Sequence, residues 1–400
     1  MVVTRPAGAN LLHNGKPLMR TVDGKQVALR TPGLVLCQAN QPVLLTASLE
    51  GFEPRDIVVD GGKESEVTSV LTVVPEHVVT FATPGQTGVA AGDGWVAVGL
   101  RGGKLGFARS DGSNRQVREL GGLKSVHSDP VISGGRIFFV SNELTVECLP
   151  VDPAVSTKGW PVKLESEAVT PLAVGDGRIA LVDASGVMHC WEQATGRRLW
   201  GVVLGSAPSG APTIVRRKAY VGTIDGRVLV FDVSDGRSLG VLRSPVGVTT
   251  PILVSGRQLF FGCSDGAVRA VDFAAGKVLW TESIGRTLLA HDLAVGQKSV
   301  VVAAEGRILS LDRNTGKHLG ELPVEDAVLG IQIQGNRAFV RTRRPRSHAQ
   351  PAHEVMVACA ADTVSVLWEF TQPCIGPGAL GVDANVVALP TRAGEIVLFR

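Results

Sequence analysis

The sequence lacks the closely spaced cysteines and histidines from which metal centres and redox sites are built. Six cysteines are scattered along 400 residues, and they are Cys37, Cys148, Cys190, Cys263, Cys359 and Cys374. No C-x-x-C, Cys-Cys or H-E-x-x-H motif occurs. We therefore expect the cysteines to be small buried apolar residues, and nothing in their spacing indicates a zinc site or a disulfide.

The sequence also lacks long apolar runs and an excess of charge of one sign. No stretch reaches the roughly 18 apolar residues that a membrane-spanning helix needs. The start, "MVVTRPAGANLL", does not have the pattern of a signal peptide. We expect a soluble monomer, either complete or part of a larger cytoplasmic or envelope protein, and leave its compartment open. The net charge of +3 favours neither nucleic acid nor membrane insertion.

Glycine is abundant, with 48 residues, and much of it follows a repeat. Four consecutive segments between residues 174 and 320 each contain an apolar strand, a turn ending in glycine, a second alternating strand and a polar turn. Their first turn glycines are 40 residues apart, and they are Gly186, Gly226, Gly266 and Gly306. A fixed period of this length, made of short strands, is typical of a β-propeller.

The same repeat extends in both directions from these four copies. Four further turn positions are Gly103, Glu143, Glu354 and Gly394. Their intervals are 40 or 43 residues, except for 48 residues between Gly306 and Glu354. We therefore predict eight blades within residues 75–400, with an insertion in the seventh.

The last copy ends directly after its third strand, at residues 395–399. A blade of four strands would then keep an unpaired edge exposed to solvent. The apolar segment "EHVVTF", residues 76–81, precedes the first copy and could fill this place. We predict that it forms the outer strand of the last blade and closes the ring.

Two features of the repeat are expected to be structural. An aspartate follows the third strand in three copies, as Asp232, Asp272 and Asp312. An aspartate before a turn accepts hydrogen bonds from backbone N–H groups. Tryptophans end the motif at Trp200, Trp280 and Trp368, and less regularly at Trp160. We expect them to pack between neighbouring blades.

These motifs resemble the PQQ-like repeat family. The matching residues are Asp265-Gly266, Asp272, Gly276-Lys277 and Leu279-Trp280, then Glu305-Gly306, Asp312 and Thr315-Gly316-Lys317, with Gly320 in place of Trp. The resemblance implies a propeller over about four-fifths of the chain. It does not select one function, because the family includes quinoprotein dehydrogenases, an outer-membrane assembly lipoprotein and regions fused to bacterial Ser/Thr kinases.

Residues 1–74 carry no copy of the repeat and are predicted to form a separate small β-sandwich. Turn sequences divide this segment, among them Asn14-Gly15, Glu50-Gly51 and Asp60-Gly61-Gly62. The segment resembles the PEGA family, a bacterial β-sandwich, at Pro6-Ala7-Gly8-Ala9, Asn14-Gly15, Thr31-Pro32 and Glu50-Gly51-Phe52. The segment from Met19 to Gln26 is longer than that family's pattern.

Quinoprotein dehydrogenases resemble one another in adjacent cysteines, a tryptophan beneath the cofactor and an acidic calcium site. The present sequence has no Cys-Cys pair, so we expect neither an enzyme nor a bound cofactor. His189 and His291 lie inside repeats and are expected to be structural or exposed. Glycine-rich turns such as Gly92-Asp93-Gly94 precede no helix, so they lack the geometry of a phosphate loop.

The insertion in the seventh copy, "RTRRPRSHAQPAH", is rich in arginine. Its arginines are Arg341, Arg343, Arg344 and Arg346. One interpretation is a solvated surface loop. The other is a recognition loop for an acidic partner surface, since arginine forms bidentate bonds with carboxylates. No aromatic residue alternates with the arginines, so nucleic acid is the weaker candidate.

We therefore predict an all-β protein, an eight-bladed PQQ-like propeller at residues 75–400 after a PEGA-like sandwich at residues 1–74. Its expected function is non-catalytic binding or scaffolding of a protein or polymer through a loop face. Two alternatives stay open, a ligand-sensing accessory region of a receptor-type Ser/Thr kinase and, least favoured, a quinoprotein dehydrogenase.

Overall fold

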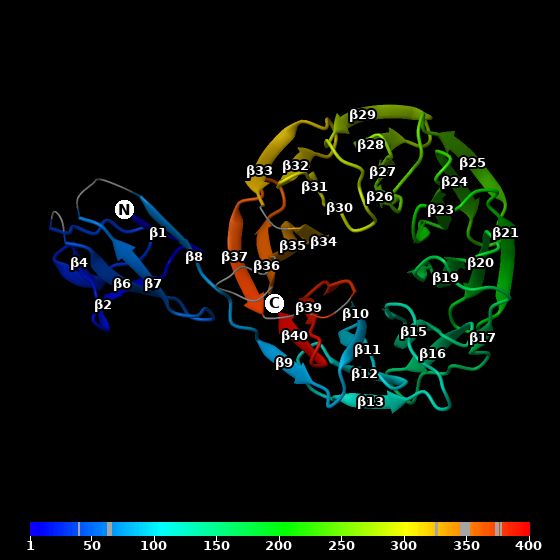
Figure 1. The fold of residues 1–400 in the computed structure, drawn as a ribbon, viewed down its shortest axis with the longest axis horizontal. Coiled ribbons are helices and arrows are strands. Elements are labelled where there is room, and N and C mark those ends of the chain that lie inside the picture. The colour runs from blue at the N-terminus through cyan, green and yellow to red at the C-terminus, as the bar shows by residue number, and fades with distance from the viewer. Residues whose placement is uncertain (39–40, 62–65, 325–326, 345–352, 373–375, 377) are drawn as a thin grey trace.

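The computed structural model describes residues 1–38, 41–61, 66–324, 327–344, 353–372, 376 and 378–400. Within these ranges the chain forms strands, turns and loops and has no helix, so no described helix could cross a membrane. Figure 1 shows a ring of sheets with a small domain beside it. The all-β fold predicted from the repeat is thus confirmed.

Eight four-stranded sheets follow one another around the ring in the described residues. The first two comprise β10 (Gly85–Gly92), β11 (Trp95–Leu100), β12 (Lys104–Arg109) and β13 (Gln116–Glu119), then β14 (Val131–Ser133), β15 (Arg136–Ser141), β16 (Thr145–Pro150) and β17 (Val162–Lys163). The third and fourth comprise β18 (Ala173–Gly175), β19 (Arg178–Val182), β20 (Val187–Glu192) and β21 (Arg198–Val203), then β22 (Thr213–Val215), β23 (Lys218–Gly222), β24 (Arg227–Asp232) and β25 (Ser238–Arg243).

The remaining sheets complete the ring. The fifth and sixth comprise β26 (Leu253–Ser255), β27 (Gln258–Gly262), β28 (Ala267–Asp272) and β29 (Lys277–Ser283), then β30 (Leu293–Val295), β31 (Ser299–Ala304), β32 (Arg307–Asp312) and β33 (His318–Pro323). The seventh comprises β34 (Ala327–Gln334), β35 (Arg337–Arg344), β36 (His353–Ala360) and β37 (Val366–Gln372). The eighth comprises β38 (Gly381–Asp383), β39 (Val386–Pro390), β40 (Glu395–Phe399) and β9 (His77–Thr80).

Strand β9 closes the ring by pairing with β40 from the far end of the chain. The pairing is antiparallel, with Glu395 opposite Thr80 and Leu398 opposite His77. Glu76 strengthens it, because its backbone N–H donates to the Leu398 carbonyl and its carboxylate lies 2.9 Å from Arg400. The pairing predicted between residues 76–81 and 395–399 is therefore present.

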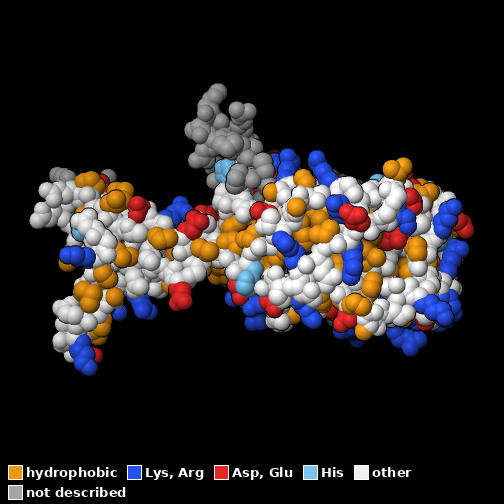
Figure 2. Space-filling model, turned by 90° about the horizontal axis from the view of Figure 1, so that it is seen from below, with side chains coloured by type: hydrophobic (Ala, Val, Ile, Leu, Met, Phe, Trp, Pro, Cys, Tyr) orange, Lys and Arg blue, Asp and Glu red, His pale blue; other side chains and the backbone are white. Residues whose placement is uncertain are grey.

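The two ends of every sheet lie on opposite faces of the ring, because neighbouring strands within each sheet are antiparallel. One face carries the turns between the second and third strands of each sheet and the links between sheets, and we call it the linker face. The face with the turns between first and second strands, and between third and fourth strands, is the turn face. Figure 2 shows the disc from its edge, with the small domain projecting from its side.

Tryptophans on or next to outer strands connect several sheets to the next one along the chain. The indole N–H groups of Trp160, Trp200 and Trp280 each donate to a carbonyl 33 residues further along, at 3.2, 3.0 and 2.9 Å. Trp200 and Trp280 are both 8% exposed. The predicted packing role of these tryptophans is confirmed.

The glycine of the next sheet's polar turn makes room for each of these rings. A Cβ atom at Gly236 or Gly316 would lie 2.8 Å from the ring of Trp200 or Trp280. Gly240 stands where those sheets have tryptophan, and a Cβ at the corresponding turn glycine, Gly276, would meet nothing within 4 Å. The tryptophan and the glycine of the following sheet's polar turn therefore act as one packing unit.

The repeat aspartates bind their own turns, as predicted. The Asp312 carboxylate accepts hydrogen bonds from the backbone N–H groups of Asn314 and Thr315 and from the Thr315 hydroxyl. These bonds, the hydroxyl bond foremost, hold the pKa of Asp312 below its ordinary value. Asp232 binds the turn at Ser234 in the same manner.

The described residues of the small domain form three strand groups. One is a four-stranded sheet in the order β3 (Lys16–Pro17), β2 (Asn10–His13), β6 (Val43–Ser48) and β7 (Arg55–Val59). The others are the parallel pair β1 (Val2–Arg5) with β8 (Val67–Val70) and the hairpin β4 (Met19–Val22) with β5 (Lys25–Ala28). The hairpin contains the segment that exceeds the PEGA pattern. The resemblance of this domain to the PEGA family stays a prediction.

The segment after β8 attaches the small domain to the seventh sheet. The Glu369 backbone donates to the Leu71 carbonyl at 3.2 Å, and its carbonyl accepts from Val73 at 2.9 Å. The Glu369 carboxylate also pairs with Arg55 at 3.2 Å. Phe52 and Val73 pack against the core cluster of the seventh and eighth sheets, so apolar contact and backbone hydrogen bonds together hold the two parts.

Candidate binding site on the linker face

The arginines of the seventh sheet do not all belong to an exposed loop. Strand β35 extends to Arg344, and Arg341 to Arg344 pair with residues His353 to Met356 of β36. Part of the predicted insertion therefore lengthens a hairpin whose strands have eight residues each. Arg346 lies outside the described residues.

Arg341 is buried, with 4% of its surface exposed. Its guanidinium pairs with Glu354 at 2.9 Å and donates to the carbonyls of Gly376, at 3.0 Å, and Gly378. These bonds join the seventh sheet to the link that leads to the eighth. The expectation that Arg341 is exposed is wrong, because β35 places it inside the hairpin next to a buried carboxylate. Partner binding by Arg341 stays a prediction.

Arg343 differs from Arg341 although it lies on the same side of the strand. Half of its side chain, 51%, is exposed, and its guanidinium lies 3.3 Å from the other oxygen of Glu354. Of the two arginines that contact Glu354, Arg343 is therefore the one exposed on the linker face. The side chain of Arg344 lies outside what the structure describes, and partner binding by Arg343, Arg344 and Arg346 stays a prediction.

A cavity of about 490 Å³ lies on the linker face against the inner strands β22, β26, β30 and β34 of four sheets. Four of its lining residues are 40 residues apart on successive links, and they are Pro171, Ala211, Pro251 and His291. Leu253, Leu293 and Ile331 supply apolar wall from β26, β30 and β34. The cavity thus offers an apolar surface with one exposed imidazole.

Sequence reasoning overlooked this cavity, because its walls come from four sheets that are distant along the chain. A signal was present in the repeat. His291 stands at a position where the three preceding copies have proline or alanine. A titratable side chain in place of small apolar ones is the kind of departure that marks an inner surface open to solvent.

Asp129 lies on the link between the first and second sheets and binds both the first sheet and the link before the eighth. Its two carboxylate oxygens accept hydrogen bonds from the backbone N–H groups of Gly88, at 2.7 Å, and Ala379, at 3.1 Å. Gly88 belongs to the first sheet and Ala379 to the link before the eighth. The linker face is therefore held together where the ring closes, in addition to the pairing of β9 with β40.

Other buried polar groups have structural partners. His189, 4% exposed, lies 2.8 Å from the buried Asp183 carboxylate and 3.1 Å from Arg198. Burial opposes ionisation of Asp183, yet bonds from Ser185, His189 and Val187 hold its pKa below the ordinary value. The described residues contain no group of three or more His, Cys, Asp or Glu suited to a metal.

The buried cysteines are poor nucleophiles. Burial raises the pKa of the Cys148, Cys190 and Cys359 thiols to about 12. Since the thiolate is the reactive form, these side chains are inert near neutral pH. They serve as small apolar core residues, as predicted.

Comparison with known proteins identifies relatives of the ring. The family described as outer membrane protein assembly factor BamB matches residues 145–288 and 264–400. The proteins of that name from Moranella endobia and Legionella pneumophila are 24% and 27% identical over 220 and 208 residues, or 51% and 47% of this chain. The chain spans 54% and 52% of their lengths, about half of each.

Solved structures share the fold. BamB from Moraxella catarrhalis superimposes with a TM-score of 0.64 at 13% identity, over 81% of this chain and 98% of that one. The computationally designed Ika8 protein gives 0.63 at 19% identity, over 80% and 97%. Sqt1 from Saccharomyces cerevisiae gives 0.58 at 10% identity, over 81% and 97%. These similarities confirm the propeller fold.

Proposed function

Because this chain belongs to the family described as outer membrane protein assembly factor BamB, we propose that it is a non-catalytic propeller that binds a protein during outer membrane protein assembly. The observation that carries the proposal is the family match across residues 145–400. The curated relatives it resembles carry that assembly role in their names.

The arrangement of the linker face supports binding of a protein. Arg341, Glu354 and Asp129 are held in place on this face by ion pairs and hydrogen bonds, and Arg343 lies half exposed next to Glu354. A rigid surface loses little conformational entropy on binding, so its contacts contribute more fully to affinity. We therefore assign the partner surface to the linker face around β35 and β36.

A non-catalytic role agrees with the chemistry of the described side chains. Their buried thiols are protonated at neutral pH. The buried Asp183–His189 pair is 1% and 4% exposed, which leaves it without access to a substrate. The buried polar groups thus support the fold.

The proposal can be tested by affinity capture from detergent-solubilised membranes of the source cell. The immobilised chain should retain components of the outer membrane protein assembly machinery, identified by mass spectrometry. Arg343→Ser should weaken this capture at low salt, because an exposed guanidinium steers and orients an acidic surface. Arg257→Ser is the matched control, since Arg257 is an exposed arginine on the turn face, with 74% of its side chain exposed.

The outcome distinguishes the alternatives. Retention of a kinase in place of assembly components would contradict the proposal and favour the sensory interpretation. Equal loss of capture in both variants would contradict the assignment to the linker face.

The 490 Å³ cavity supports a second candidate, the binding of a small ligand near His291. Native mass spectrometry of the purified chain tests it directly. A stoichiometric adduct that is lost in His291→Ala would support ligand sensing. The bare chain mass in both proteins would contradict this second candidate.

A further inference from the structure

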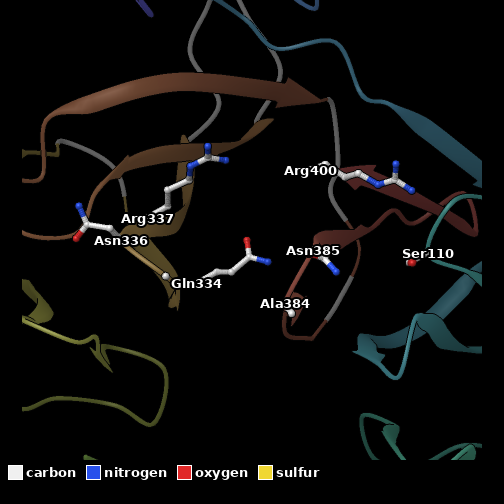
Figure 3. Close-up of a pocket in the computed structure, with 8 residues that line it drawn as sticks. Ser110, Gln334, Asn336, Arg337, Ala384, Asn385 and Arg400 are labelled. Atoms are coloured by element: carbon white, nitrogen blue, oxygen red, sulfur yellow. The ribbon is translucent and has the colours of Figure 1, made fainter.

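A second surface, on the turn face, has the features of a peptide-binding groove. It lies between the seventh and eighth sheets and consists of two adjoining cavities of about 710 and 430 Å³, which share Arg337 and Arg400. The larger cavity is lined mainly by polar residues, and Figure 3 shows Gln334 and Arg337 on one side of it and Asn385 and Arg400 on the other. Gln334, Asn336 and Arg337 come from the β34–β35 turn, while Asn385 and Arg400 come from the eighth sheet.

Arg337 is an exposed cation without a partner among the described residues. The repeat supplies an internal comparison, because Arg136 and Lys218 also stand at the start of a second strand. Arg136 donates to the carbonyls of Ser156 and Gly134, and Lys218 lies over the Phe273 ring, 5.8 Å from its centroid. Of these three residues, only Arg337 makes no hydrogen bond, ion pair or cation–π contact with a described residue.

The carboxylates around the groove are already engaged. Glu76 pairs with Arg400 at 2.9 Å. Asp383 accepts from the backbone N–H groups of Ala384, at 2.7 Å, and Gly94, at 3.4 Å. Asp111 binds Ser113, and those bonds, with a smaller contribution from the Arg400 charge, keep its pKa below the ordinary value. The available guanidinium at Arg337 is therefore complementary to a carboxylate from another molecule.

The smaller cavity adds an apolar socket next to this cation. Its walls include Phe52, Val74, Leu367 and Trp368, where the small domain meets the ring. Val74 is 47% exposed, so the socket is open to solvent. An aromatic or large aliphatic side chain placed there would bury apolar surface beside Arg337.

We propose that this groove binds an extended peptide segment that carries a carboxylate next to a large apolar side chain. The amides of Asn336 and Asn385 can donate to and accept from a peptide backbone. Nucleic acid fits less well, because one free guanidinium next to an apolar socket does not form a basic track. The inference rests on the proposed protein-binding function but uses the opposite face from Arg343.

The test is a fluorescence-anisotropy titration with a labelled peptide Gly-Ser-Phe-Asp-Asp-Ser-Gly. The wild-type chain should bind it, and Arg337→Gln should weaken binding at least tenfold, equivalent to about 1.4 kcal/mol. Replacing both aspartates by asparagine, or the phenylalanine by alanine, should weaken binding as well. Val74→Asp should do the same from the socket side, while Arg257→Gln, on the same face, should bind like wild type.

Several results would overturn the inference. They are equal affinity for the aspartate and asparagine peptides, an unchanged affinity in Arg337→Gln, or the absence of binding up to millimolar concentration. Displacement of the peptide by inorganic phosphate as effectively as by unlabelled peptide would indicate a simple anion site. Tighter binding of single-stranded DNA would indicate a nucleic-acid surface. Arg343 is not part of this groove, so a negative peptide titration would not bear on the capture experiment, which tests the linker face.

Discussion

Individual residues in this ring derive their roles from their neighbours in the next sheet. The Trp280 indole donates to the Arg313 carbonyl, and its ring leaves no room for a Cβ at Gly316. The same turn position in the preceding sheet, Gly276, faces open space because Gly240 replaces the tryptophan. The repeat thus provides a matched pair of glycines that differ in one contact.

This pair predicts different responses to the same substitution. Both glycines have positive φ, 72° at Gly316 and 62° at Gly276, so alanine is strained at each. Gly316→Ala should lower the free energy of unfolding by roughly 1–3 kcal/mol more than Gly276→Ala, because only its Cβ overlaps a ring. Urea denaturation checks this difference, which should vanish in a Trp280→Ala background. An undiminished difference there would contradict the packing account.

Trp280→Ala itself should lower the free energy of unfolding by roughly 3–5 kcal/mol, because it removes a buried ring and leaves the Arg313 carbonyl without its donor. Val278→Ala is the control, since Val278 lies on the same strand and is 47% exposed. A change below about 1 kcal/mol in Trp280→Ala would mean that its ring is accessible and free to contact a ligand.

Arg341 and Arg343 should behave differently although both contact Glu354. Arg341→Met should lower the free energy of unfolding by about 3 kcal/mol, because it leaves the buried Glu354 carboxylate without its main partner. Arg343→Ser should change it by less than about 1 kcal/mol, as expected for an exposed ion pair. The double variant Arg341→Met, Glu354→Met should recover much of the loss. Equal effects of the two single variants in chemical denaturation would contradict the described burial.

At the scale of elements, the ring is closed by β9, the first strand after the small domain, which pairs with β40, the last strand of the chain. Removal of residues 1–82 should leave β40 with an exposed edge and produce aggregation, because an unpaired edge is a template for further pairing. Removal of residues 1–70 keeps β9 and should give a folded ring. Size-exclusion chromatography with light scattering distinguishes the two products. Monomeric, folded protein after both deletions would contradict closure by this strand.

The sequence predicted this closure because a missing fourth strand and a spare apolar segment are both visible in the repeat. It could not predict the burial of Arg341. An insertion at a strand-to-strand connection can lengthen the loop or the two strands, and in this chain β35 and β36 pair as far as Arg344 and His353. The pairing depends on the partner strand, which the local residues of the insertion do not reveal.

At the scale of the whole molecule, the forty-residue period was sufficient to predict the fold. The arginine-rich insertion was visible in the sequence, but the cavity near His291 and the turn-face groove required the structure. The cavity near His291 gathers residues from four sheets. The turn-face groove combines the seventh and eighth sheets with the small domain. The cavity shows in the sequence only as a histidine at a position where the preceding copies have proline or alanine. The groove shows no such signal, because Arg136 and Lys218 occupy the position equivalent to Arg337.

The most direct test of the proposed function is site-specific photo-crosslinking in the source cell, with a photoreactive amino acid at position 343 or at position 257. Both positions are exposed arginines, on the linker face and on the turn face. The account predicts crosslinks from position 343 to a component of the outer membrane protein assembly machinery, with few or none from position 257. Crosslinks from position 343 to unrelated proteins only, or equal crosslinking to that machinery from both positions, would contradict it.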